Sequence, residues 1–168
     1  MTQPQQKFDW KYTNTGYRDE GTGLTIEHDQ DADDPNSWGD PQEQDFLVIW
    51  LGHRFRPYTI QGLREPSDLE EWTDTHQIVP LGVLEHGGIA IERSPSCAFD
   101  SRGGAFALLR KDGQGDIEDR IQVLIDIWNC YLSGDIWGVQ SPSGNAVWGI
   151  YGLDHAKQEA VWIYNGAA

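Results

Sequence analysis

The residues best suited to chemistry in this sequence are carboxylates that lie close together between positions 29 and 40. Asp29, Asp31 and Asp33 alternate along the chain, and Asp40 is the twelfth residue counted from Asp29. These are the ligand offsets of a calcium-binding loop, in which hard oxygen atoms surround the ion. The sixth position holds Asp34, where such a loop needs glycine for its sharp turn. The pattern therefore leaves open a Ca²⁺ site at these four aspartates, but it favours a solvated acidic loop.

A second group of reactive side chains comprises His86, Cys97, Asp100 and Ser101. A histidine that is oriented by a carboxylate can activate a thiolate as a nucleophile. We expect His86 at the tip of a hairpin and Cys97 just beyond its second strand, so the two can approach each other. We favour a structural role for both residues, in which Cys97 packs in the interior and His86 caps or braces a turn. An isolated cysteine usually packs as a small hydrophobic residue. A small enzyme that uses His86, Cys97 and Asp100, or a metal held by carboxylates, is the alternative.

The charge of the chain is strongly acidic and unevenly distributed. Asp and Glu outnumber Lys and Arg by 27 to 12, and the net charge is −15. Residues 1–45 hold 11 acids and three bases, which gives 11 − 3 = 8 of the 15 surplus charges. Such a field repels nucleic acid and attracts proteins that have basic, nucleic-acid-binding surfaces. Only four of the 12 bases are lysine, so adaptation to salt is an alternative explanation that needs no partner.

Two further clusters of acids fall where helices are expected, and they extend the possible binding surface. Carboxylates on one face can imitate the phosphates of DNA, which carries about one charge per 1.7 Å of axis. Exposed aromatic side chains from residues 8–38 would supply the apolar anchors of such an interface. The two clusters are Asp68, Glu70, Glu71 and Asp74, and then Asp112, Asp116, Glu118 and Asp119. The residues that we expect to contact a partner are Asp29, Asp31, Asp33, Asp34, Asp40, Glu70 and Glu71.

Composition also limits the class and the location of the protein. The first residues are polar and do not resemble a secretion signal, and the longest apolar run, residues 46–51, is too short to span a bilayer. Two cysteines, Cys97 and Cys130, do not make a disulfide framework. We therefore expect an intracellular, cytoplasmic protein with reduced thiols, no membrane contact and no direct contact with nucleic acid.

The elements that must position these residues are mostly strands. Residues 46–51 form a continuous apolar run of strand length, which predicts a strand buried on both faces. Residues 29–41 are rich in Asp, Asn, Pro and Gly and predict a loop. Short strands are also expected at 24–26, 58–60 and 105–109, and two hairpins at 78–84 with 89–91 and at 136–139 with 147–151.

Helices are expected at three places. Apolar residues at 117, 121, 124, 125, 128 and 132 share one face of a 3.6-residue period, and Gly134 follows as the end of this helix. A short helix is expected with Ser67 as N-cap, Glu70 in a capping box, and Leu69 and Trp72 on one side. Another helix is expected over 155–164.

These elements predict a single α+β domain, in which one long amphipathic helix and one or two short helices cover a mostly antiparallel sheet. Residues 1–44 would be an acidic, aromatic-containing N-terminal segment of this domain, and residues 45–168 its α+β core.

Three stretches, in the same order and at similar spacing, resemble a family of uncharacterised small proteins encoded by bacteriophages and integrated mobile elements. They are residues 33–40 (DDPNSWGD) with Gly52-His53-Arg54-Phe55, residues 85–91 (EHGGIAI) with 95–101 (PSCAFDS), and residues 131–138 (YLSGDIWG) with 148–152 (WGIYG). The sequence departs from the family's pattern at Pro35-Asn36 and at Phe99. It also departs at Gly87, a position at which the family has serine. The resemblance implies an origin in a mobile element.

Charge and resemblance together predict an acidic phage or mobile-element protein that binds and inhibits a host nucleic-acid-binding defence protein. The inhibitor would be of the anti-CRISPR or antirestriction type and would act by DNA mimicry. Two alternatives stay open: the small enzyme described above, and an acidic structural or regulatory phage protein.

Overall fold

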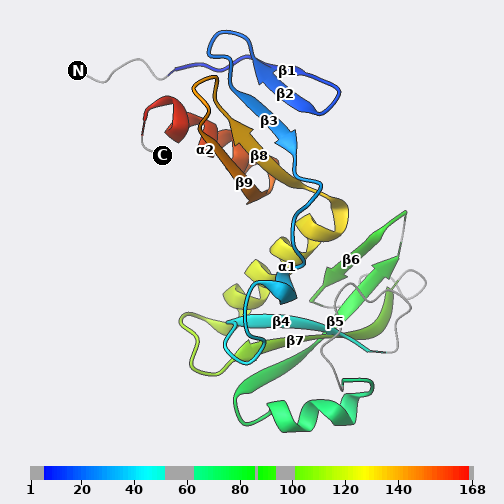
Figure 1. Ribbon diagram of the computed structural model, residues 1–168. Coiled ribbons are helices and arrows are strands. Elements are labelled where there is room, and N and C mark those ends of the chain that lie inside the picture. The colour runs from blue at the N-terminus through cyan, green and yellow to red at the C-terminus, as the bar shows by residue number, and fades with distance from the viewer. Residues whose placement is uncertain (1–5, 52–62, 86, 94–100, 167–168) are drawn as a thin grey trace. The chain divides into compact units, whose positions relative to one another are not determined.

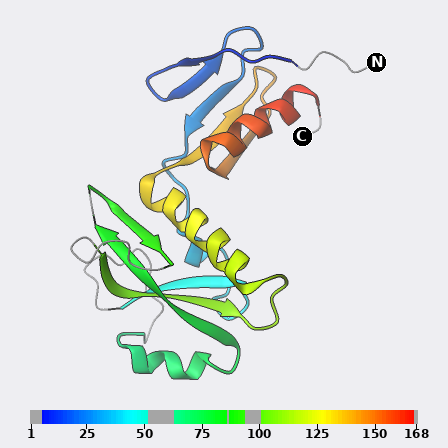
Figure 2. The same cartoon turned by 180° about the vertical axis from the view of Figure 1, so that it is seen from behind.

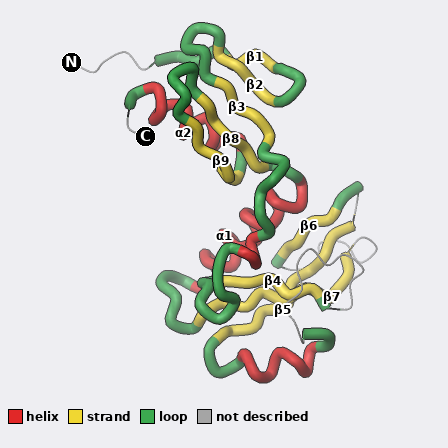
Figure 3. Tube along the Cα trace, viewed as in Figure 1, coloured by secondary structure: helices red, strands yellow, loops and turns green. Residues whose placement is uncertain are grey.

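The chain divides into two compact units that each contain one β-sheet. The computed structural model describes residues 6–51, 63–85, 87–93 and 101–166. The first unit comprises Met1–Ala32 and Gly134–Ala168, and the second comprises Asp33–Ser133. All strand pairs in both sheets are antiparallel, so the predicted α+β class with mostly antiparallel strands is confirmed (Figures 1 and 3).

The first unit is a five-stranded sheet with one helix packed on it. The strand order is β1-β2-β3-β8-β9, and helix α2 lies along one face of this sheet (Figure 2). Small residues of α2, Ala156 and Ala160, are fully buried and allow the helix to approach Ile26 and Val139 of the sheet closely. The elements are β1 Trp10–Tyr12, β2 Gly16–Asp19, β3 Thr25–His28, β8 Ile136–Gln140, β9 Ala146–Tyr151 and α2 Leu153–Tyr164.

The second unit is a four-stranded sheet with helices against both faces. The strand order is β4-β7-β5-β6, so β7 is inserted between two strands that precede it in the sequence. The elements are η1 Pro35–Ser37, β4 Phe46–Trp50, η2 Pro66–Trp72, β5 His76–Glu85, β6 Ile89–Glu92, β7 Ser101–Arg110 and α1 Ile117–Ser133, where η marks a 3₁₀-helix.

Strand β4 is buried on both faces, as its apolar run predicts. Val48 and Trp50 point into the cluster beneath α1, whereas Leu47 and Ile49 belong to the cluster that packs against η2. Successive side chains of a strand alternate between the faces of the sheet, so a strand covered on both sides must be apolar throughout.

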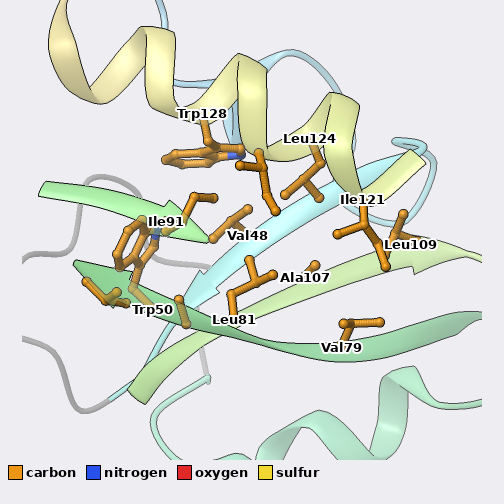
Figure 4. Close-up of a cluster of buried hydrophobic side chains, with 13 residues drawn as sticks. Val48, Trp50, Val79, Leu81, Ile91, Ala107, Leu109, Ile121, Leu124 and Trp128 are labelled. Carbon is orange, nitrogen blue, oxygen red and sulfur yellow. The ribbon is translucent and has the colours of Figure 1, made fainter. Parts of the chain in front are cut away.

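Helix α1 covers one face of the second sheet through its predicted apolar stripe. Ile121, Leu124 and Trp128 point from the helix toward the strands below (Figure 4). The helix starts after Asp116, whose Oδ1 accepts hydrogen bonds from the backbone N–H of Glu118 (2.9 Å) and Asp119 (3.3 Å). It ends before Gly134, whose φ of +75° is a conformation that glycine adopts without steric cost.

Most of the predicted elements are confirmed, and the differences have local causes. Both predicted hairpins and the C-terminal helix are present, whereas the expected strand at 58–60 lies outside the described residues. The predicted cap of the short helix was wrong: η2 begins two residues earlier than a Ser67 cap requires. The carboxylate of Asp68 accepts hydrogen bonds from the backbone N–H of Arg64 (2.8 Å) and Glu65 (3.0 Å), and Pro66 takes the first helical position.

Strands β1 and β2 were not predicted at all. Their residues are polar or aromatic without clear alternation, and their place in the sheet is set by pairing with β3.

Candidate functional site

Carboxylates from three chain segments line one hollow of the second unit. The residue before β4 contributes Asp45, and the loop after β7 contributes Asp112. The residue that caps α1 and the first turn of this helix contribute Asp116 and Asp119. The hollow has a volume of about 440 Å³. We call it the acidic hollow. Its other lining residues are Phe46, Gly113, Gln114, Gly115, Arg120 and Val123.

The acidic hollow is positioned by the pairing of β4 with β7. Phe46 is opposite Leu109, and the backbone N–H of Arg110 donates to the carbonyl of Asp45 (3.0 Å). The start of β4 and the end of β7 therefore coincide at one end of the sheet. A short loop then leads from β7 to Asp116, which caps α1 and places its carboxylate at the same end.

The two arginines nearest to the acidic hollow are engaged by groups of this chain. Arg110 donates from Nε and Nη2 to both carboxylate oxygens of Asp112, at 2.8 and 2.9 Å, and from Nη1 to the carbonyl of Gln42. These hydrogen bonds hold the pKa of Asp112 below its ordinary value. Arg120 donates from Nη2 to the carbonyls of Arg110 (3.0 Å) and Asp45 (3.4 Å).

Gly113 allows Arg120 to take this position. A Cβ atom on Gly113 would collide with the guanidinium group of Arg120. The absence of a side chain therefore lets the guanidinium lie against the loop, where it joins the end of β7 to the start of β4. Arg120 acts as an internal brace rather than as a neutralising partner for Asp116 or Asp119.

Apolar side chains accompany the carboxylates. Phe46 lies in the wall of the acidic hollow, and the ring of Trp38 meets it edge-on at a centroid distance of 6.4 Å. Trp38 is 49% exposed and Val123, on α1, is 53% exposed. The surface thus combines negative charge with exposed apolar groups, the mixture that anchors protein–protein interfaces.

The residues that the sequence singled out for partner binding are divided between the two units. Asp29 and Asp31 belong to the first unit, and the other five belong to the second. Asp29 accepts hydrogen bonds from the backbone N–H of Asp31 (3.1 Å) and of Gly149 (2.9 Å). Its carboxylate therefore links the end of β3 to β9 and stabilises the first unit.

Within the second unit, Asp34 and Asp40 shape the segment before β4. Asp34 is half-buried, and its Oδ1 accepts from the N–H of Asn36 (2.8 Å). Burial raises the pKa of Asp34. Asp40 is exposed and accepts from the N–H of Gln42 (2.9 Å) in the turn that leads to Asp45, while Asp33 is exposed before η1.

Glu70 and Glu71 are exposed on η2, and neither lines the acidic hollow. The sequence identified Asp112, Asp116 and Asp119 only as a cluster around a helix start. It gave no reason to join them to Asp45, because the pairing of β4 with β7 spans about sixty residues of chain. The turn sequence Lys111-Asp112-Gly113 correctly predicts where β7 ends, but it does not identify β4 as the strand that pairs with β7.

The remaining chemical predictions are not tested. His86, Cys97 and Asp100 lie outside the described residues, so the thiol hypothesis stays a prediction. In the part of the chain that the structure describes, no three His, Cys, Asp or Glu side chains gather in a way that could hold a metal ion. The Ca²⁺ ligand set of Asp29, Asp31, Asp33 and Asp40 is split between the two units.

The comparisons with known proteins give no relative for this chain. No family model matches it, and neither a curated protein nor a solved structure does. Among the described residues, none of the helices has the length and apolar character needed to cross a bilayer.

Proposed function

We propose that this protein binds the basic, nucleic-acid-binding surface of a host defence protein and blocks it by imitating DNA. The inhibitor would be of the anti-CRISPR or antirestriction type and would come from a phage or mobile element. The observation that carries the proposal is the acidic hollow, where four carboxylates from three segments lie beside exposed apolar side chains.

The distribution of charge over the two units supports this proposal. The second unit has 18 acids and eight bases, a net charge of 8 − 18 = −10, whereas the first has nine acids and four bases, or 4 − 9 = −5. Two thirds of the negative charge therefore belongs to the unit that contains the acidic hollow. A surface of this kind steers basic partners toward it and makes association fast at low salt.

The local chemistry supports the same partner. Arg110 and Arg120 are held by Asp112 and by backbone carbonyls, so an arriving arginine or lysine would meet the carboxylates of Asp45, Asp116 and Asp119. Carboxylates bind guanidinium groups in a fork geometry similar to that of phosphates. Trp38 and Val123 offer the apolar contact that charges alone do not provide.

The test is competition with DNA. A purified CRISPR effector nuclease or restriction endonuclease is bound to a fluorescent duplex, and this protein is titrated against the complex at increasing salt. We expect displacement of the duplex that weakens steeply between 50 and 200 mM salt, on the order of the salt dependence of DNA binding itself. Displacement that does not depend on salt, or no displacement from any member of a panel of such enzymes, would refute the proposal.

A matched pair of variants locates the surface. Asp45→Asn, Asp116→Asn and Asp119→Asn remove three charges from the acidic hollow, and asparagine at position 116 still caps α1. Asp9→Asn, Glu20→Gln and Asp154→Asn remove three exposed charges from the first unit. Exposed ion pairs contribute roughly 0.2–1 kcal/mol each, so the first triple variant should bind about 3- to 150-fold more weakly. Equal loss in both variants would show that net charge alone drives binding.

A further inference from the structure

His76 is a buried histidine with no part in the proposed binding surface. It begins β5, it is 1% exposed, and its ring packs edge-on against Trp72 of η2 at a centroid distance of 5.1 Å. Its Nδ1 is 2.8 Å from the hydroxyl oxygen of Thr75. Its Nε2 is buried and has no hydrogen-bond partner among the residues that the structure describes. The hydroxyl of Thr75 donates to the carbonyl of Trp72 (3.4 Å), which assigns Nδ1 of the neutral ring as the donor to Thr75 and leaves Nε2 unprotonated. A second proton, on Nε2, would therefore place an N–H donor where none of the described residues accepts it.

The charged groups around His76 make a proton there still less favourable. Arg110 of β7 is opposite His76 in the sheet, and its positive charge opposes a second one. Asp112 follows in the same loop and acts in the opposite direction, but it is already bound to Arg110. The negative charges of Glu43 and Asp45, before β4, raise the pKa of Arg110 and so favour its positive charge. From η2, the aromatic ring of Trp72 packs against the imidazole. Burial first, and then Arg110, lower the pKa of His76.

The element that packs on His76 is a short 3₁₀-helix with two buried side chains. The 3₁₀-helix η2 has seven residues, and it is held to the sheet by Leu69 and Trp72, which pack with Leu47, Ile49 and Leu108. Short 3₁₀-helices have weak hydrogen bonds, and segments with few buried contacts open without unfolding the whole protein. Opening of η2 would remove Trp72 from the imidazole and expose Nε2 to water.

We propose that His76 is a proton-sensitive latch: the neutral ring holds η2 against the second sheet, and protonation releases it. The closed state excludes the proton and the open state accepts it on Nε2, so acid favours the open state. One proton taken up on opening makes the open population rise about fivefold over the first pH unit below the ordinary histidine pKa of about 6.5, and toward tenfold for each further unit. The rise ends where the closed state itself becomes protonated. This latch does not depend on the proposed function.

Hydrogen exchange tests the latch directly. The amides of η2 in the wild-type protein should exchange about fivefold faster at pH 5.5 than at pH 6.5, after correction for the intrinsic effect of pH. Amides of β2 and β3, in the other unit, should not show this acceleration. His76→Phe keeps an aromatic ring against Trp72 without a titrating group, and it should abolish the acceleration. His155→Gln is the matched control, because it removes an exposed histidine of α2 and leaves the latch intact.

The ring itself provides a second measurement that needs no variant. The NMR titration of the His76 ring protons should show a neutral imidazole at pH 6.5, with protonation only at lower pH. A ring that titrates normally near pH 6.5, or acceleration in η2 that persists in His76→Phe, would overturn the proposal. If His76→Phe does not fold, the wild-type titration together with His76→Gln decides the question.

Discussion

The two sheets of this protein differ in how their faces and edges are covered. Both faces of the second sheet are packed, by α1 on one side and by η2 on the other, whereas α2 packs on one face of the first sheet. On the face opposite α2, the ring of Trp148 lies over Gly138 and is 45% exposed. Trp128, in the second unit, is fully buried. Trp128 therefore belongs to the core of the second sheet, whereas Trp148 covers the outer face of the first.

The edges of the second sheet are each occupied by one asparagine side chain. Asn36 donates from Nδ2 to the carbonyl of Val48 on β4 (2.6 Å), and its Oδ1 accepts from the N–H of Val48 (3.0 Å). Asn129 of α1 forms the same pair of hydrogen bonds with Ile91 on β6, at 2.9 and 2.8 Å. Each amide takes the place of a neighbouring strand at one residue and so discourages pairing with another chain.

The edges of the first sheet have features that hinder pairing with another chain: a short strand, a lysine and a bulge. Strand β1 has three residues and carries Lys11 in its centre. Strand β9 contains a bulge at Gly149, whose φ is +72°, where its register with β8 shifts. Short strands, lysine and bulges all hinder edge-to-edge association. The comparison teaches that the edges of the second sheet depend on side-chain hydrogen bonds from asparagine, whereas the edges of the first sheet depend on strand length, a lysine and backbone geometry.

The largest expected effect concerns the core of the second unit. Trp128→Ala removes a fully buried indole that packs with Trp50 and Tyr131, and it should lower the free energy of unfolding by about 3–5 kcal/mol. Urea denaturation followed by circular dichroism measures this loss. A loss below about 1 kcal/mol would mean that the face beneath α1 is not the main core.

The edge asparagines provide the next test of the comparison. Asn36→Ala leaves the buried N–H and C=O of Val48 unpaired and should cost about 2–4 kcal/mol. Asn129→Ala should cost about 1–2 kcal/mol, because Asn129 is partly exposed and water can take the place of its amide. Urea denaturation gives both values. Sedimentation should also detect self-association of the variants, because each opens a strand edge. Equal, negligible costs would contradict the sealing role.

A pH-dependent effect is expected in the first unit. Asp19 is 3% exposed and accepts hydrogen bonds from Thr22 Oγ1 (2.5 Å), from Thr22 N–H (2.9 Å) and from Asp9 N–H (2.8 Å). These bonds lower its pKa, so its contribution to stability is present above the unfolded value of about 3.9 and is lost as pH falls through the lower folded value. Asp19→Asn should therefore be less stable than wild type at pH 7, and the difference should shrink below pH 4.

The measurement for Asp19 is the melting temperature of both proteins between pH 7 and pH 2. A constant difference over this range would show that the carboxylate charge plays no part. The window lies below that expected for His76, so the two groups are distinguishable.

The smallest effect should come from the exposed tryptophan of the first unit. Trp148→Ala should change stability by less than about 1 kcal/mol, because nearly half of the side chain is already in water. Comparison with Trp128→Ala in the same urea experiment measures the contrast between the two sheets. A cost as large as that of Trp128→Ala would remove the distinction.

Strong periodicity made the second sheet and its helix predictable. The continuous apolar run of β4 predicts a strand that is covered on both faces, and the apolar stripe of α1 predicts a helix that is covered on one. Both are buried in this way in the structure. Strands β1 and β2 were missed because aromatic residues and turns mask their alternation. Their pairing depends on β3 and β8, which are more than a hundred residues apart in sequence.

The acidic character of the candidate site could be predicted from the sequence, but the set of residues that form it could not. The acids around Asp116 were identified as a cluster, yet their meeting with Asp45 depends on the register of β4 against β7. Charge counts also suggested that the aspartates from 29 to 40 act together. In the structure, Asp29 bonds to Gly149, while Asp34 and Asp40 organise the approach to β4, so backbone hydrogen bonding divides their tasks.

The position of β7 between β4 and β5 has a consequence for synthesis on the ribosome. Among the described strands β4 pairs only with β7, and sixty residues separate Trp50 from Arg110. At a translation rate of roughly 5–20 residues per second, the most apolar strand of the chain waits about 3–12 s for its neighbour. During this interval β4 is a target for chaperones and for aggregation, and slower codons between β4 and β7 should lower the soluble yield.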